Sequence, residues 1–153
     1  MTRALSPVVG TVLLLAITVV LAGTVGLVVF EDAPAEPAPR ATFSLDADAT
    51  ADRIVLTHEG GDALSTTDLT VRVRVDGQPL DHQPPVPFFA SKGFHGGPTG
   101  PFNAATDPEW SAGEDAGFEL ASTNDPLLEQ GSTVEVTISS EGAVIVAVEG
   151  EAT

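Results

Sequence analysis

The residues of this chain that could carry out chemistry are few and widely spaced. Its three histidines are His58, His82 and His95. Histidine zinc sites normally use a short spacing such as H-x-x-x-H, which these three lack. Serine, histidine and aspartate all occur, yet no G-x-S-x-G nucleophile motif accompanies them. The chain has no cysteine, which excludes thiol-redox, iron–sulfur and cysteine-zinc chemistry.

Carboxylate pairs and a glycine-rich run are the remaining candidates for ion binding. Asp46 with Asp48, or Glu114 with Asp115, could bind Ca²⁺, but neither pair has EF-hand spacing. A chain with 22 acidic residues contains such pairs by chance, so a solvated surface is expected. The run 96–100 lacks the G-K-[ST] ending of a phosphate loop. We therefore expect no enzyme, with no catalytic residues, no metal, no cofactor and no small-molecule substrate.

An uncharged stretch, residues 5–30, organises the rest of the chain. A helix from Pro7 to Phe30 would be roughly 36 Å long, which is enough to cross the ~30 Å hydrocarbon core of a bilayer with some tilt. Ser6 is the expected N-cap, and Pro7 loses no hydrogen bond at the first helical position. The sequence therefore predicts a transmembrane helix.

The residues on either side of this stretch predict which terminus lies in the cytoplasm. They also bear on two alternative interpretations, a cleaved signal peptide and an ordinary membrane anchor. Arg3 precedes it, whereas Glu31 and Asp32 follow, so the N-terminus is expected in the cytoplasm and the C-terminus outside. A cleaved signal peptide would explain the A-x-A pattern at 33–35, but its apolar region should be only about 7–15 residues long. An ordinary membrane anchor explains length and orientation, but not the sequence of residues 3–10.

Residues 3–10 (RALSPVVG) and 13–22 (LLLAITVVLA) resemble the N-terminus of type IV pilins of halophilic archaea. The resemblance implies that a prepilin peptidase cuts between Ala4 and Leu5 and removes a cytoplasmic leader, residues 1–4. The residues implied in processing are Arg3, Ala4, Leu5, Ser6 and Pro7. The sequence departs from bacterial pilins, which have glutamate where Val9 stands. It also lacks the glycine-rich start of archaellins, which argues against a swimming filament.

The part of the chain after Phe30 is strongly acidic. All 22 acidic residues and five of the six basic ones lie there, for a formal charge of −17. Such a charge disfavours nucleic acid and anionic membrane surfaces as partners. It suits high salt, since the Debye length falls to about 3 Å at 1 M. Residues 31–40 are acidic and proline-rich, and are expected to form an extended linker.

From residue 41 onward the apolar residues alternate with period two. This alternation predicts strands within 41–45, 52–58, 68–76 and 132–140. Residues 143–149 (AVIVAVE) are apolar on both faces and are expected to be central or packed on a neighbour. The predicted fold is therefore α+β, with one long N-terminal hydrophobic helix followed by a small antiparallel β-sandwich at 41–153.

Residues 80–110 break the strand pattern and hold four of the seven phenylalanines and the only tryptophan. The aromatic residues are Phe88, Phe89, Phe94, Phe102 and Trp110. The favoured interpretation is that they fold over the sandwich as a cover. The alternative is an exposed surface for contacts with other subunits or a host surface.

The functional prediction rests on the helix. Small residues favour close helix packing in an apolar medium, and those expected to do so are Gly10, Ala16, Ala22, Gly23 and Gly26. The resemblance implies a structural subunit of an archaeal type IV pilus-like filament that mediates adhesion or attachment. Its implied partners are the membrane, the prepilin peptidase and identical or different pilin subunits. The alternative is a monomeric membrane-anchored extracellular binding domain of a halophile.

Overall fold

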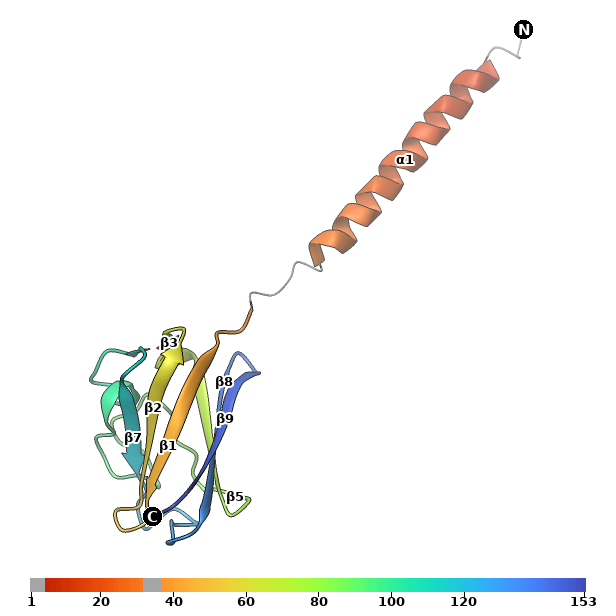
Figure 1. The fold of residues 1–153 in the computed structure, drawn as a ribbon. Coiled ribbons are helices and arrows are strands. Elements are labelled where there is room, and N and C mark those ends of the chain that lie inside the picture. The colour runs from red at the N-terminus through yellow and green to blue at the C-terminus, as the bar shows by residue number, and fades with distance from the viewer. Residues whose placement is uncertain (1–4, 32–36) are drawn as a thin grey trace. The chain divides into compact units, whose positions relative to one another are not determined.

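A computed structural model describes residues 5–31 and 37–153 of the chain. The chain divides into two units, Met1–Pro37 and Ala38–Thr153. The first contains the helix α1 (Leu5–Glu31), and the second contains the strands (Figure 1). The predicted leader, residues 1–4, and residues 32–36 of the predicted linker lie outside the described residues.

The second unit, which we call the β domain, is built from antiparallel sheets, so the α+β prediction is confirmed. A three-stranded sheet has the order β1-β2-β7, a four-stranded sheet has the order β5-β4-β8-β9, and β3 pairs with β6. The elements are β1 (Ala41–Asp48), β2 (Arg53–Gly61), β3 (Leu64–Ser65), η1 (Thr66–Asp68), β4 (Leu69–Val75), β5 (Gln78–Pro79), η2 (Gly100–Phe102), β6 (Glu109–Trp110), β7 (Asp115–Glu119), β8 (Thr133–Ser140) and β9 (Ala143–Glu151).

The core lies between the inner faces of the two larger sheets. In β4 every second residue is buried, as the period-two pattern predicts. Val71 and Val73 of β4 lie opposite Ile138 and Val136 of β8, and all four are at most 1% exposed. Ile54 of β2 belongs to the same buried cluster. Burying each such side chain contributes about 1.5–3 kcal/mol, so the alternating strands hold the sandwich together.

The strand β9 is the edge of the four-stranded sheet, so the expectation of a central position is wrong. Its inner-face residues Val146 and Val148 pack against the core, whereas Val144 is 63% exposed on the outer side. The alternative expectation, packing on a neighbour, agrees with the structure at Gly150. A Cβ there would lie only 3.3 Å from the Leu45 side chain of β1.

The strand β7 was not expected, because its sequence DAGFE has no run of alternating apolar residues. It is covered along one edge by residues 94–99, which we call the cover segment. The amide of Thr99 donates to the carbonyl of Gly117 (2.8 Å), and that of His95 donates to the carbonyl of Glu119 (2.9 Å). Gly117 must be small, because a Cβ would lie 2.7 Å from the carbonyl oxygen of Ile54.

The opposite edge of the four-stranded sheet is closed by a side chain. β5 pairs with only two residues of β4. Two residues before Val75 on β4, the side-chain amide of Gln83 makes the hydrogen bonds that a neighbouring strand would make. Its Oε1 accepts from the Val73 amide (2.7 Å), and its Nε2 donates to the Val73 carbonyl (3.0 Å). Unpaired strand edges promote association with other chains, so Gln83 limits the edge that β4 presents.

The aromatic residues of 80–110 are mostly core residues. Phe88, Phe94, Phe102 and Trp110 are between 0% and 6% exposed, while Phe89 is 65% exposed. Buried rings cannot form a contact surface, so the exposed-surface alternative is wrong for these four in this structure. These four rings agree with the cover interpretation. Phe89 is exposed, so the exposed-surface interpretation still applies to this one ring.

Candidate functional site

The helix α1 exposes apolar side chains all round. The described side chains from Ser6 to Val25 are all exposed within the unit, among them Leu14 (70%) and Leu15 (69%). Among the described residues, the span Ser6–Val25 is the one helix long and apolar enough to cross a membrane by length and composition. A helix that is apolar on every side requires burial in lipid or among other helices.

The three threonine hydroxyls of α1 form hydrogen bonds inside the helix. The hydroxyls of Thr11, Thr18 and Thr24 donate to the carbonyls of Val8 (2.8 Å), Leu14 (2.7 Å) and Leu21 (2.9 Å), respectively. Back-bonding of this kind is common where no water is present. The three threonines therefore present mainly their methyl groups to the surroundings.

The predicted packing residues occupy two sides of α1. Gly10 forms the floor of a shallow groove, lined by Pro7, Gly10, Thr11, Leu14, Leu15 and Thr18. At ~100° per residue, Gly23 lies about 140° around the helix from Gly10. Ala16, Ala22, Gly23 and Gly26 share a sector about 120° wide opposite Gly10. A Cβ added at Gly10 or at Gly23 would have no neighbouring atom within 4 Å, so the space beside each glycine is open.

The predicted processing site is only partly described. Arg3 and Ala4 lie outside the described residues, while α1 begins at Leu5. The helix therefore starts before Ser6, which lies in the first turn instead of preceding it. The expected N-cap role of Ser6 is therefore wrong, whereas the apolar segment keeps its expected extent.

The histidines of the β domain do not share a site. His58 is fully buried, where its Nε2 donates to the carbonyl of Asp62 (2.9 Å) and its ring lies edge-on to Phe43. His82 and His95 are in the long loop that follows β5. Within residues 5–31 and 37–153, no group of three His, Cys, Asp or Glu side chains is placed to hold a metal ion.

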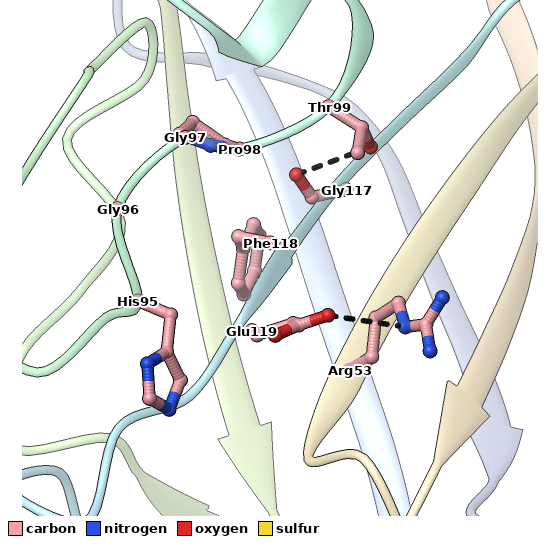
Figure 2. Close-up of a pocket in the computed structure, with 9 residues that line it drawn as sticks. All are labelled: Arg53, His95, Gly96, Gly97, Pro98, Thr99, Gly117, Phe118 and Glu119. Carbon is pink, nitrogen blue, oxygen red and sulfur yellow. Dashed lines mark hydrogen bonds and ion pairs between the residues drawn. The ribbon is translucent and has the colours of Figure 1, made fainter.

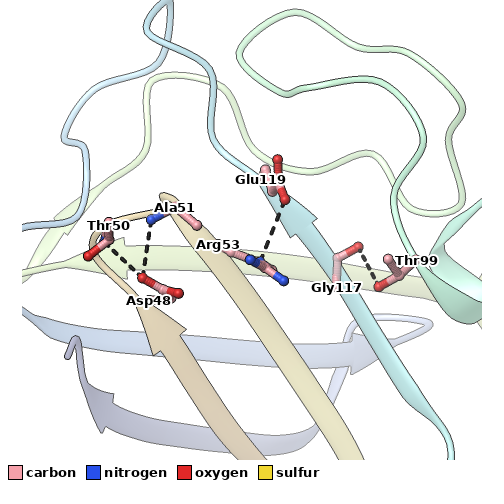
Figure 3. Close-up of polar contacts among 7 residues, drawn as sticks. All are labelled: Asp48, Thr50, Ala51, Arg53, Thr99, Gly117 and Glu119. Carbon is pink, nitrogen blue, oxygen red and sulfur yellow. Dashed lines mark hydrogen bonds and ion pairs between the residues drawn. The ribbon is translucent and has the colours of Figure 1, made fainter.

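At least one residue of each candidate carboxylate pair accepts hydrogen bonds within the β domain, as Asp48 and Asp115 show. Asp48 Oδ1 accepts from the amides of Thr50 (2.8 Å) and Ala51 (3.1 Å) at the β1–β2 turn (Figure 3). Asp115 Oδ1 accepts from the Thr57 hydroxyl (2.7 Å). A carboxylate that accepts backbone amides as Asp48 does stabilises a turn.

A small open cavity of about 220 Å³ lies beside the cover segment (Figure 2). Its lining residues are Arg53, His95, Gly96, Gly97, Pro98, Thr99, Gly117, Phe118 and Glu119. Arg53 Nε and Glu119 Oε1 are 3.6 Å apart, and each side chain is 46% exposed. Exposed ion pairs contribute about 0–1 kcal/mol, so this pair has little effect on stability. This ion pair was not recognised from the sequence, because Arg53 and Glu119 lie on strands that are neighbours in the sheet but far apart along the chain.

Comparison with protein families gives a match over the helix. Residues 3–43 match the family described as archaeal type IV pilin, N-terminal. The match and the apolar helix together fit a membrane-anchored pilin. They support the archaeal pilin part of the resemblance and do not test its halophilic part.

The comparison also found a similar protein. An uncharacterized protein of Archaeoglobus fulgidus is 39% identical over 74 residues, which cover 46% of this chain and 52% of that protein. The chain thus spans about half the length of the curated relative it matches.

Proposed function

We propose that the chain is a structural subunit of an archaeal type IV pilus-like filament that mediates adhesion or surface attachment. The observation that carries this proposal is the exposure of apolar side chains on every side of α1, at the position of the pilin match. Burying apolar surface is worth about 25 cal/mol per Å². The helix is therefore held in the membrane before assembly and among other helices in the filament.

The two-sided distribution of small residues supports packing with several neighbours. Gly10 would admit a helix on one side, and Gly23 with Ala22 would admit another on the opposite side. A helix with a single close-packing side would suit a dimer, whereas contacts on different sides can repeat along a filament. The neighbouring subunits are copies of this chain or other pilins.

Maturation follows from the same proposal. A prepilin peptidase cuts between Ala4 and Leu5 on the cytoplasmic side, and the remaining chain spans the membrane with its C-terminus outside before it joins a filament. Mass spectrometry of the membrane or filament form should find Leu5 at the mature N-terminus. A terminus at Glu36, after the A-x-A pattern, would instead mean a cleaved signal peptide and would overturn the proposal.

Packing of the helix is tested by substitution at Gly23. Gly23→Leu should leave membrane insertion and cleavage unchanged, because leucine is favourable in lipid. It should lower the filament yield about tenfold, since overpacking of a close contact costs about 1–3 kcal/mol. Val20→Leu, which exchanges one bulky apolar residue for another, is the matched control. Electron microscopy of cells that express each variant gives the yield, and equal yields would contradict helix packing at Gly23.

The second candidate is a monomeric, membrane-anchored binding domain. The exposed ring of Phe89 favours it, because a large apolar side chain at the surface of the β domain can contact a partner. This candidate requires no cut before Leu5 and no filament, so the mass spectrometry and microscopy above separate the two.

A further inference from the structure

The cover segment pairs with β7 at Thr99 and then bows away from it. The Thr99 amide donates to the Gly117 carbonyl (2.8 Å), and the Gly117 amide donates back to the Thr99 carbonyl (3.3 Å). Regular antiparallel pairing would next set Gly97 opposite Glu119. The Gly97 amide instead donates to the Phe89 carbonyl (2.8 Å). The cavity of about 220 Å³ lies where the two segments separate, and we call it the cover gap (Figure 2).

The separation leaves a backbone donor of β7 without an acceptor. In the β2–β7 ladder the Leu120 amide donates to the Asp52 carbonyl (2.8 Å). Because hydrogen-bonded pairs alternate along such a ladder, the Glu119 amide points to the other side, toward the cover segment. Within residues 37–153, neither this amide nor that of Gly96, which also lines the gap, has a backbone acceptor. Free backbone donors of this kind bind water or a ligand.

Four polar side chains surround the cover gap and add both donors and acceptors (Figure 2). They belong to Arg53, His95, Thr99 and Glu119. Arg53 Nε and Glu119 Oε1 are 3.6 Å apart, which is longer than a hydrogen bond. The donors of the guanidinium and the acceptors of the carboxylate therefore remain available to a ligand.

The charges around the gap select an uncharged ligand. Asp48 on β1 and Glu119 on β7 are the two cross-strand neighbours of Arg53, and Asp46 lies two residues before Asp48 on the same side of β1 (Figure 3). Three carboxylates near one guanidinium disfavour an anion. A cation has no atom that can accept from the free amides of Gly96 and Glu119. Hydroxyl groups meet both requirements, because each one donates once and accepts through two lone pairs.

We infer that the cover gap binds a neutral sugar residue of a glycan on the surface to which the filament attaches. One hydroxyl accepts from Arg53 and from the Glu119 amide, while a neighbouring hydroxyl donates to the Glu119 carboxylate. The volume is below the ~300–1,000 Å³ of sites for drug-sized ligands, so a single sugar ring is the expected occupant. The inference rests on the proposed function, since it names the ligand by which an attachment filament would hold a surface.

The exposed ring of Phe89 adds an apolar element close to this polar site. The Phe89 carbonyl accepts from Gly97, which lines the gap, and the Phe89 ring is 65% exposed. Sugars have apolar C–H surfaces as well as hydroxyls, and aromatic rings supply large apolar contact areas. A second sugar of the same glycan can therefore pack on this ring.

Binding is tested by saturation-transfer NMR on the detergent-solubilised full-length chain in molar potassium chloride. The probes are the methyl glycosides of glucose, mannose, galactose and N-acetylglucosamine, with acetate as an anionic probe. At least one glycoside should receive magnetisation from the protein, and acetate should not. Arg53→Ala and Glu119→Ala should each weaken glycoside binding about tenfold or more, because each removes charge-assisted hydrogen bonds. Arg74→Ala, an exposed arginine of the other large sheet, is the matched control and should bind normally.

The outcomes of this experiment are decisive for the inference. No transfer to any of the four glycosides, or transfer to acetate alone, would overturn it. Normal binding by both Arg53→Ala and Glu119→Ala would also overturn it, as would an equal loss in Arg74→Ala. The urea midpoint of Trp110 fluorescence verifies that each variant is folded, which the exposure of both side chains leads us to expect. Thr99→Val, which removes one lining hydroxyl at nearly constant volume, gives an independent variant that should also bind more weakly.

Attachment is tested with purified filaments and beads coated with dextran, mannan or galactan. Wild-type filaments should bind at least one coating, and periodate treatment of those beads should abolish binding, because periodate cleaves between neighbouring hydroxyls. Arg53→Ala should give a normal filament yield and at least tenfold fewer bound filaments. Normal binding of Arg53→Ala filaments, or binding that survives periodate, would overturn the glycan inference alone. A mature chain that forms no filaments would overturn the proposed function, and the NMR measurement would still decide whether the cover gap binds sugars.

Discussion

The helix and the β domain solve the burial of apolar residues in opposite ways. In the β domain the large apolar side chains face inward, and Ile54, Leu56 and Val73 are fully buried within one copy. In α1 they face outward, and Leu14 and Leu15 are about two-thirds exposed. The β domain is thus complete as a fold, whereas α1 obtains its burial from lipid or from other chains. Substitutions should therefore separate folding from assembly.

Loss of a core ring should have the largest effect on the β domain. Phe102→Ala should lower its free energy of unfolding by about 3–5 kcal/mol, because Phe102 is fully buried against Trp110. Urea unfolding of the detergent-solubilised full-length chain, followed by the fluorescence of Trp110, measures this change. Phe89→Ala is the matched control, and its midpoint should hardly move. A large shift for Phe89→Ala would contradict its exposure.

A charge in the helix should have a comparable effect on membrane insertion and none on the β domain. Leu14→Asp places a carboxylate near the middle of α1, at an insertion cost of about 2.5–3.5 kcal/mol. Membrane fractionation should therefore show less inserted protein, while the urea midpoint of Trp110 fluorescence stays unchanged. Leu14→Val, which remains apolar, serves as the control. A shifted midpoint would mean that the two regions are coupled.

A smaller effect is expected where the cover segment meets β7. Gly117→Ala should destabilise the β domain by about 1–3 kcal/mol, because the new Cβ would crowd the Ile54 carbonyl. Gly131→Ala is less suitable as a comparison because its φ is +89°. Gly60→Ala is the better control, since a Cβ there meets nothing within 4 Å. Equal unfolding midpoints for the two variants would contradict the close approach.

The smallest effect concerns the edge of the four-stranded sheet. Gln83→Met keeps the approximate side-chain volume but removes both hydrogen bonds to Val73, which should cost about 1 kcal/mol. Gln78→Met, at an exposed position of β5, is the matched control. If the two variants unfold at the same urea concentration, the Gln83 amide does not stabilise this edge.

The helix and the principal strands could be predicted from the sequence, because both depend on local periodicity. The strands β4 and β8 follow a period of two without interruption. The strand β7 could not be predicted, since its pairing depends on the cover segment and on close packing at Gly117. The edge position of β9 was missed because an apolar strand at an edge looks the same in sequence as a central one.

The candidate site divides in the same way. The apolar helix and its small residues could be recognised from composition, whereas the position of each charged strand residue relative to its cross-strand partner required the strand register. Arg72 and Arg74 were seen only as the polar half of an alternating strand. The residues of β8 that lie opposite them are Thr137 and Glu135, and the sequence does not encode this register locally.

The threonines of α1, whose hydroxyls donate to carbonyls of their own helix, affect the free energy of moving the helix from lipid into a protein interior. Their hydroxyls keep the same acceptors whether lipid or protein surrounds the helix, so transfer breaks no hydrogen bond to the surroundings. Lipid tails are about as apolar as leucine, so the net free energy of moving the helix from one to the other is small. In a filament subunit of the kind proposed above, such a helix can leave the bilayer and return to it, and the direction of transfer is then set by how well neighbouring helices fit.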